Sequence, residues 1–242
     1  MPDCVVIIPA RLASERLPGK MLLAETGKPL VQHTVERAQA ADVGPVVVAA
    51  DDPTIADAVA PFGTDVVLTD PNHPSGTDRI AEVAAGRGEP FVVNVQGDEP
   101  EIEPGIIRGL AERIDERGVV MGTASVPYVG DAADPNRVKV VVGVDDRALY
   151  FSRSPIPFNR GDAVPPRLHV GIYAYTRSFL LRYPTLEPTP LERAEKLEQL
   201  RALEHGFRID VLAADGHAAG IDTAEQYAAF VTRQSRGAPS DF

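Results

Sequence analysis

The loop that follows the first apolar run carries three cationic side chains at close spacing. After the run Cys4–Ile8 come Arg11, Arg16 and Lys20, and a proline-glycine pair directly precedes the lysine. Cationic groups and free backbone N–H groups at the carboxyl end of a buried parallel strand suit a polyphosphate. The loop has neither the glycine spacing of a P-loop nor the dinucleotide-binding glycine pattern. We therefore expect a loop that surrounds a triphosphate, the alternative being a solvated basic loop.

Acidic residues from two distant stretches could complete such a site. Asp98 and Glu99 follow the apolar run 91–95, so their carboxylates are expected at the same edge of the sheet as the cationic loop. Carboxylate oxygens there suit Mg²⁺, which bridges carboxylate and phosphate. Asp222 is the candidate second carboxylate. Because it stands at the start of a predicted helix, it equally fits an N-cap, and the sequence leaves both interpretations open.

A third polar segment, Ser75–Arg79, begins another predicted helix. Its N–H groups and hydroxyls could contact a base or a sugar, and Arg79 could pair with an anion, although the same pattern is a common helix start. No spacing of histidine, cysteine and aspartate indicates zinc. No serine-histidine-acid or cysteine-histidine arrangement indicates a covalent nucleophile.

The elements that must position these residues alternate between strand and helix patterns. Near-continuous apolar runs in the first half are typical of a parallel sheet covered on both faces. Helical apolar stripes at 30–38 and 55–60 separate them, the second after an Asp52 cap and a first-turn proline. The series predicts one α/β domain with a Rossmann-like, mixed but mostly parallel sheet flanked by helices. Its first four predicted strands are 4–8, 46–50, 65–68 and 91–95.

The second half predicts a less regular addition to this sheet. Runs at 138–144 and 148–151 flank an Asp145-Asp146 turn and indicate a hairpin or a meander. Thr189–Glu192 has the form of a capping box, and we expect one helix to continue from it through Leu203. The remaining predicted strands are 119–126, 169–175 and 207–212.

Composition excludes several classes of protein. The chain has 242 residues, of which 44% are hydrophobic, so it is neither disordered nor fibrous. Its net charge of −11 disfavours nonspecific nucleic-acid binding. No run of 18 apolar residues indicates a membrane span, and a strand begins too early to leave room for a signal peptide. The one cysteine, Cys4, cannot form an internal disulfide, and all of this favours the cytoplasm.

The motifs taken together resemble those of the 3-deoxy-D-manno-octulosonate cytidylyltransferase family, also called the CMP-Kdo synthetases. The resemblance covers nearly the whole chain, and the order of many modest motifs makes it specific. The motifs are 8–11, 17–20, 75–79, 94–100, 136–141, 150–153, 169–173, 190–192, 197–201 and 220–223.

The resemblance implies a nucleotide-diphospho-sugar transferase fold, with an inserted β-rich part at roughly 127–190 that serves dimerisation and sugar binding. It implies that CTP and a 3-deoxy-octulosonate (Kdo) react to CMP-Kdo and pyrophosphate for lipopolysaccharide-type glycan synthesis. It also implies Mg²⁺ as cofactor and a homodimer, with no nucleic-acid or membrane partner.

Site residues follow from the matching motif positions. The resemblance implies catalytic roles for Arg11, Lys20 and Asp98, and metal binding by Asp98 and Asp222. Nucleotide binding is implied for Ala10, Arg11, Arg16, Lys20, Ser75, Gly76 and Thr77. Sugar binding is implied for Arg79, Gln96, Arg153, His169, Tyr173, Glu198 and Gln199.

The same motifs are compatible with other functions. The loop between Phe158 and His169 is shorter than in the family and borders the expected sugar pocket. An 8-amino form of the sugar or a nonulosonic (sialic-type) acid is therefore an alternative substrate. A non-catalytic nucleotide-sensing homologue is the alternative from another class, although Lys20 and Asp98 are both present. A glycosyltransferase would need an Asp-x-Asp motif, which no suitable strand precedes.

Overall fold

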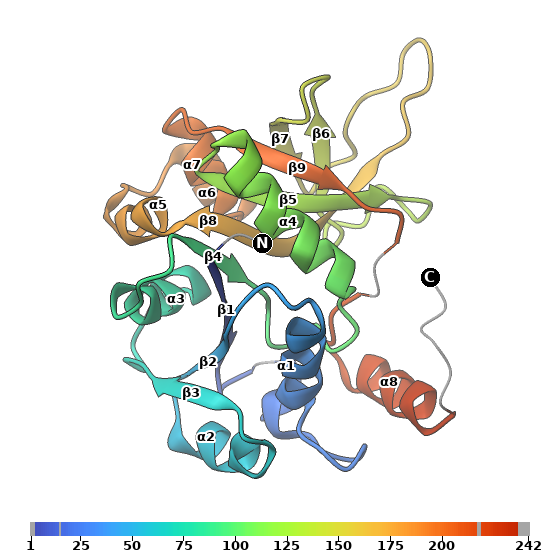
Figure 1. Ribbon diagram of the computed structural model, residues 1–242. Coiled ribbons are helices and arrows are strands. Elements are labelled where there is room, and N and C mark those ends of the chain that lie inside the picture. The colour runs from blue at the N-terminus through green and yellow to red at the C-terminus, as the bar shows by residue number, and fades with distance from the viewer. Residues whose placement is uncertain (1–2, 15, 217–218, 237–242) are drawn as a thin grey trace.

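One mixed β-sheet runs through the protein, with helices on both faces (Figure 1). The computed structural model describes residues 3–14, 16–216 and 219–236. The first half of the sheet has the strand order β3-β2-β1-β4, and its neighbouring strands are parallel, as predicted. These strands are β1 (Cys4–Ala10), β2 (Val46–Ala50), β3 (Asp65–Leu68) and β4 (Phe91–Asn94). Their connecting helices are α1 (Leu30–Ala40), α2 (Pro53–Val59) and α3 (Gly76–Ala85).

The second half extends the sheet with β8 (Arg167–Thr176) between β4 and β5 (Met121–Pro127), antiparallel to both. At the edge, β9 (Ile209–Ala213) lies parallel to β5. The predicted hairpin is confirmed: β6 (Lys139–Val142) and β7 (Ala148–Ser152) pair antiparallel, and β6 joins the sheet through β8.

Alternation along the buried strands divides the core into two layers. In β1, Val6 and Ile8 pack on the side of α1 and of α4 (Pro104–Arg117), which crosses in front of β5 and β8 in Figure 1. Val5 and Ile7 pack on the other side with α3 and with α5 (Arg177–Arg182), which a short 3-10 helix, η3 (Tyr183–Thr185), follows. Because successive strand side chains point to opposite faces, a strand covered on both faces must be apolar throughout.

The prediction of a single helix after the capping box is wrong. The capping box of Thr189 and Glu192 is present, but it opens a short helix, α6 (Pro190–Glu195), and a second one, α7 (Gln199–Glu204), follows. Lys196 ends α6 with a left-handed backbone conformation, at φ 55°. The chain therefore turns between the two helices, which brings Leu197 and Glu198 to the surface of a cavity described below.

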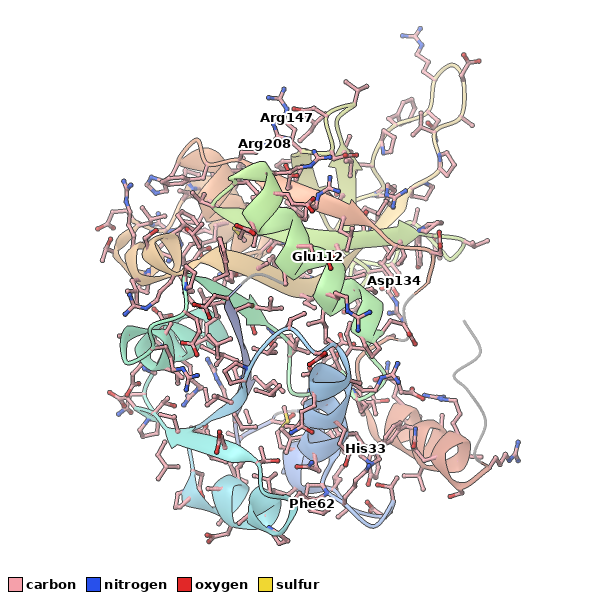
Figure 2. The ribbon with its side chains drawn as sticks, viewed as in Figure 1. His33, Phe62, Glu112, Asp134, Arg147 and Arg208 are labelled. Atoms are coloured by element: carbon pink, nitrogen blue, oxygen red, sulfur yellow. The ribbon has the colours of Figure 1, made fainter. Side chains whose placement is uncertain are left out.

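The C-terminal helix α8 (Ala224–Arg236) packs against the beginning of α1 through a small separate core of Leu30, Ile221, Tyr227 and Phe230. His33 projects from α1 toward this helix (Figure 2), and its ring meets the Phe230 ring edge-on at 4.9 Å between centroids. This packing fixes α8 close to the loop that carries Arg16 and Lys20.

Among the described residues, no helix combines the length and the apolar character that crossing a membrane requires.

Candidate active site

Lys20 lies at the centre of the predicted cluster. Its Nζ donates hydrogen bonds to Asp98 Oδ2 at 2.5 Å, to Asp222 Oδ1 at 3.1 Å and to the Ile221 carbonyl oxygen at 3.2 Å. The residue opens a 3-10 helix, η1 (Lys20–Leu22), directly after Gly19, whose φ of 65° favours glycine. The predicted convergence of the lysine with both carboxylates is thus present, although about 80 and 200 positions separate them in the chain.

Charge holds this cluster together. Burial alone would lower the pKa of Lys20, which is 8% exposed, but the carboxylates of Asp98 and then Asp222 outweigh it and the pKa is raised. Arg16 Nη2 lies 2.9 Å from Asp222 Oδ1. Two cations and two carboxylates therefore balance one another, and the lysine is fully protonated at neutral pH.

The structure also decides between the two interpretations of Asp222. Thr223 Oγ1 accepts a hydrogen bond from the backbone N–H of Gln226 at 3.3 Å, so Thr223 caps α8. The carboxylate of Asp222 faces Lys20 and Arg16 instead. The N-cap interpretation of Asp222 is wrong, and its carboxylate is available at the site.

A cavity of about 340 Å³ opens beside Lys20 at the carboxyl end of β1. Gly97 permits this geometry, since a Cβ there would lie 2.9 Å from the Pro9 carbonyl oxygen and 3.1 Å from the Met21 sulfur. Seven predicted site residues line the cavity: Arg11, Lys20, Ser75, Gly76 and Asp98, and two of those predicted to bind the sugar, Gln96 and Glu198. Ala10 is fully buried beside them in β1, and Arg16 and Thr77 line neighbouring cavities instead.

A second cavity, of about 460 Å³, adjoins the first, and both are lined by Gly76, Gln96 and Glu198. Thr77 Oγ1 donates a hydrogen bond to Glu198 Oε2 at 2.8 Å and so ties α3 to the turn between α6 and α7. Five of the residues predicted to bind sugar line this cavity, namely Gln96, Arg153, Tyr173, Glu198 and Gln199. Burial raises the pKa of Tyr173 far above its usual range, so its hydroxyl is a donor at neutral pH.

Gln199 and Arg153 differ in whether other protein groups already satisfy the hydrogen-bond donors of their side chains. The side-chain nitrogen of Gln199 is buried and has no hydrogen-bond partner among the described residues. A buried amide in this state fits a polar ligand in the cavity. The guanidinium of Arg153 donates to three carbonyl oxygens instead, those of Glu195, Pro135 and Lys196, at 2.7, 2.8 and 3.3 Å.

Two predicted sugar residues lie elsewhere. Arg79 is fully buried near the loop that carries Arg11, Arg16 and Lys20, which is called the phosphate loop from here on after its predicted role. It is hydrogen-bonded to the Thr69 hydroxyl and lies 3.9 Å from Asp51 Oδ2. The structure therefore does not bring Arg79 to the second cavity. His169 lines a third cavity of about 620 Å³, which also reaches Arg16 and both carboxylates of the cluster, and its Nε2 lies 3.0 Å from Thr123 Oγ1.

The two aspartates fit a magnesium ion. No group of three or more histidine, cysteine, aspartate or glutamate residues in the described part of the chain could by itself hold a metal. Mg²⁺ is usually bound in proteins by one or two carboxylates, with substrate phosphates and water completing its shell. Asp98, which lines the first and third cavities, and Asp222, which lines the third, share the Lys20 ammonium and match that donor set.

Three residues at the site were missed from the sequence. Asp51 Oδ1 accepts the backbone N–H of Leu12 at 2.8 Å and thereby holds the phosphate loop, yet a single aspartate after a strand gives no signal. Lys196 lines the second cavity from a backbone conformation that no sequence pattern predicts. Gln226 could have been found, because Thr223 and Gln226 have the spacing of a capping box.

Comparison with known proteins gives a consistent result. A model of the cytidylyltransferase family matches residues 5–209. A 3-deoxy-manno-octulosonate cytidylyltransferase from Geobacter metallireducens is 47% identical over 246 residues, covering 95% of this chain and 97% of that protein. One from Geobacter sulfurreducens is 49% identical over 237 residues, covering 91% and 95%.

A solved structure of a CMP:2-keto-3-deoxy-manno-octonic acid synthetase complexed with CTP aligns with a TM-score of 0.93 at 40% identity, covering 97% of this chain and 99% of that one. A cytidylyltransferase from Leptospira borgpetersenii, at 18% identity and a TM-score of 0.65 over 98% of this chain and 88% of that one, shares the fold. The chain therefore belongs to the cytidylyltransferase family and, within it, to the 3-deoxy-manno-octulosonate cytidylyltransferases.

Proposed function

We propose that the protein transfers the cytidylyl group of CTP to a 3-deoxy-octulosonate, giving CMP-Kdo and pyrophosphate. The observation that carries the proposal is the position of Lys20, which contacts Asp98 and Asp222 and lines the first cavity, to which the second cavity is joined. Such a cluster of opposite charges suits a polyphosphate and its counter-ion. The relatives described above carry the name of this activity.

The two cavities suit two substrates. The nucleotide occupies the cavity at the phosphate loop, with its phosphates toward Arg11 and Lys20, and the sugar acid occupies the cavity beside it. Because Gln96 and Glu198 line both cavities, the two substrates lie next to each other, and the anomeric hydroxyl at C2 of the sugar attacks the α-phosphorus as pyrophosphate leaves. Positioning of this kind supplies most of the catalysis in phosphoryl-type transfers.

The cationic side chains neutralise the charge that develops on the phosphate oxygens. Lys20 is pre-positioned by its carboxylate partners, so it reorganises little when the nucleotide arrives. Asp98 and Asp222 would hold Mg²⁺, which when bound supplies further positive charge to the phosphates and lowers the pKa of the attacking hydroxyl. Arg16, at 2.9 Å from Asp222, adds a second cation at the same end of the site.

The proposal includes a homodimer that works in the cytoplasm and supplies lipopolysaccharide-type glycan synthesis. Large apolar side chains are exposed in the stretch 127–190, with Val129 98% and Phe158 88% exposed, which supports a protein partner for this part.

The one cysteine, Cys4, is a buried free thiol, and burial raises its pKa to about 12, so it is inert.

Pyrophosphate release tests the function. The purified protein is incubated with CTP and Mg²⁺ across a panel of acid sugars, with UTP, ATP and GTP as nucleotide controls. We expect release with CTP and Kdo and much less with the other nucleotides. Release with an 8-amino-Kdo or a sialic acid but not with Kdo would show that the proposed substrate is wrong and that the other sugar acid is the substrate. No release with any sugar would favour a nucleotide-sensing protein.

A further inference from the structure

The peptide that carries Asp222 is held by one side chain from α8. Gln226 Oε1 accepts hydrogen bonds from the backbone N–H of Asp222 at 2.7 Å and from that of Thr223 at 3.0 Å. Two donors converge on this atom, so the oxygen end of the amide must face them. A capping box ties only the N–H of the cap residue, here Thr223. The bond to the N–H of Asp222 is therefore more than the start of α8 requires.

Asp222 needs such a restraint because packing does not supply one. Its side chain is 37% exposed, and Asp222 Oδ1 lies within 3.1 Å of Lys20 Nζ and within 2.9 Å of Arg16 Nη2. On the other side, the N–H of Ile221 donates to the Asp98 carbonyl oxygen at 2.8 Å. The segment 221–222 is thus fixed from the Asp98 loop on one side and from Gln226 on the other.

The helix that carries Gln226, α8, is itself held in place by the rest of the protein. The next residue, Tyr227, and Phe230 one turn later are buried in the small core with Leu30. Near the end of α8, Arg233 forms a bidentate ion pair with Glu101, at 3.0 and 2.5 Å. The restraint on Asp222 therefore originates in a helix that is anchored at both ends.

We infer that Gln226 is a positioning residue for the phosphate and metal end of the site. Its amide oxygen fixes the Asp222 backbone, so that the carboxylate is held where it meets Lys20 and, on the proposed function, Mg²⁺. Gln226 touches no reacting atom in this role, and the inference rests on the proposed function only through Asp222. Residues that orient metal ligands by hydrogen bonding typically change metal affinity by about 10- to 100-fold.

Metal binding without turnover tests the inference. Mn²⁺ replaces Mg²⁺ as the probe and is titrated by electron paramagnetic resonance in the presence of CTP, with no sugar. Gln226→Met keeps the volume of the side chain but removes the acceptor, and we expect Mn²⁺ to bind about tenfold more weakly. Gln226→Glu keeps an acceptor for both N–H groups, and we expect its affinity to return to within a few-fold of the wild type.

Two further variants separate positioning from stability. Thr223→Ala removes the cap of α8 but leaves the bond from the Asp222 N–H, so we expect a lower melting temperature with near-normal Mn²⁺ affinity. Gln234→Ala is the matched control, an exposed glutamine on the same helix, and it should change neither. Gln226→Ala serves if Gln226→Met does not fold, as circular dichroism will show.

The outcomes distinguish this inference from the function on which it rests. Wild-type Mn²⁺ affinity in Gln226→Met overturns it if Asp222→Ala binds weakly, and the proposed metal role of Asp222 then stands. An equal loss of affinity in Thr223→Ala and Gln226→Met also overturns it, because helix stability would then explain both. Wild-type affinity in Asp222→Ala removes the proposed metal role and this inference together.

Discussion

Lys20 Nζ lies 2.5 Å from Asp98 Oδ2, although 78 positions separate the two residues in the chain. Lys20 is on the loop after β1, and Asp98 is on the loop after β4. These strands are parallel neighbours, so their carboxyl ends meet at one edge of the sheet. The contact therefore places the cation that is expected to meet the phosphates beside one of the two expected metal ligands.

Lys20→Met should abolish most of the activity and leave the fold intact. The variant keeps the packing of the side-chain stem but removes the ammonium, and loss of one pre-positioned charge typically costs about 100-fold or more in kcat. Arg16 continues to pair with Asp222, so we expect the free energy of unfolding to fall by only about 1 kcal/mol. Pyrophosphate release and thermal melting measure the two effects.

Lys28→Met is the control for that variant, because Lys28 pairs with Glu36 on α1 and lines neither substrate cavity. Wild-type turnover in Lys20→Met, or an equal loss in Lys28→Met, would remove Lys20 from the catalytic machinery.

Asp98→Asn and Asp222→Asn should each raise the Mg²⁺ concentration that gives half-maximal activity. An amide keeps the size of the side chain but loses the charge that a hard divalent cation prefers. We expect a shift of about tenfold or more in a Mg²⁺ titration at saturating CTP. Asp215→Asn, an exposed aspartate outside these cavities, should not shift the titration. An unchanged titration for Asp98→Asn would contradict its assignment as a ligand.

The fold was predictable where burial alone determines the pattern. The strands β1, β2 and β4 are apolar because helices cover both faces of that part of the sheet, whereas the edge strand β3 is largely exposed. The hairpin β6–β7 has a turn signal between two β-rich runs. The break after α6 was not predictable, because neither glycine nor proline marks it. Lys196 turns the chain there because Leu197 packs into the core and Arg153 binds the carbonyl oxygens of Glu195 and Lys196.

The site was predictable where strand ends dictate it, and less so along a helix. Lys20 and Asp98 follow adjacent parallel strands, so the topology brings them together. Thr77 and Arg79 share one motif, yet residues two apart on a helix point in different directions. Thr77 contacts Glu198 at the second cavity, whereas Arg79 lies under the phosphate loop. Only the fold decides which of them meets a substrate.

Arg79→Lys should weaken the binding of CTP and leave the binding of the sugar acid nearly unchanged. Arg79 lies near Asp51, whose carboxylate holds the backbone N–H of Leu12 in the phosphate loop. A lysine keeps the charge but loses the planar guanidinium, so the Asp51 contact and the loop should loosen. We expect the KM for CTP to rise several-fold and the KM for the sugar acid to stay within about twofold. A raised KM for the sugar acid with an unchanged KM for CTP would mean that Arg79 acts on sugar binding, as the sequence predicted.

His33 should make the stability of the protein depend on pH. Its Nε2 lies 2.7 Å from Thr26 Oγ1. Burial, and after it the charge of Lys28, lowers the pKa of His33 from 6.5 to about 4, against the opposing charges of Glu36 and Glu101. Between these two values the unfolded chain binds a proton that the folded protein does not. The free energy of unfolding should therefore fall as the pH drops below about 6.5, by roughly 2 kcal/mol at pH 5.

Urea denaturation at pH 8, 6.5 and 5 measures this contribution as a difference between the wild type and His33→Gln. Carboxylates that titrate below pH 5 act equally on both proteins, so the difference isolates the histidine. We expect the wild type to lose about 2 kcal/mol more than the variant between pH 8 and pH 5. His205→Gln, at an exposed histidine, should follow the wild type. Parallel pH curves for His33→Gln and the wild type would mean that His33 is already accessible to protons in the folded protein, and that α8 packs more loosely on α1 than its contact with Phe230 implies.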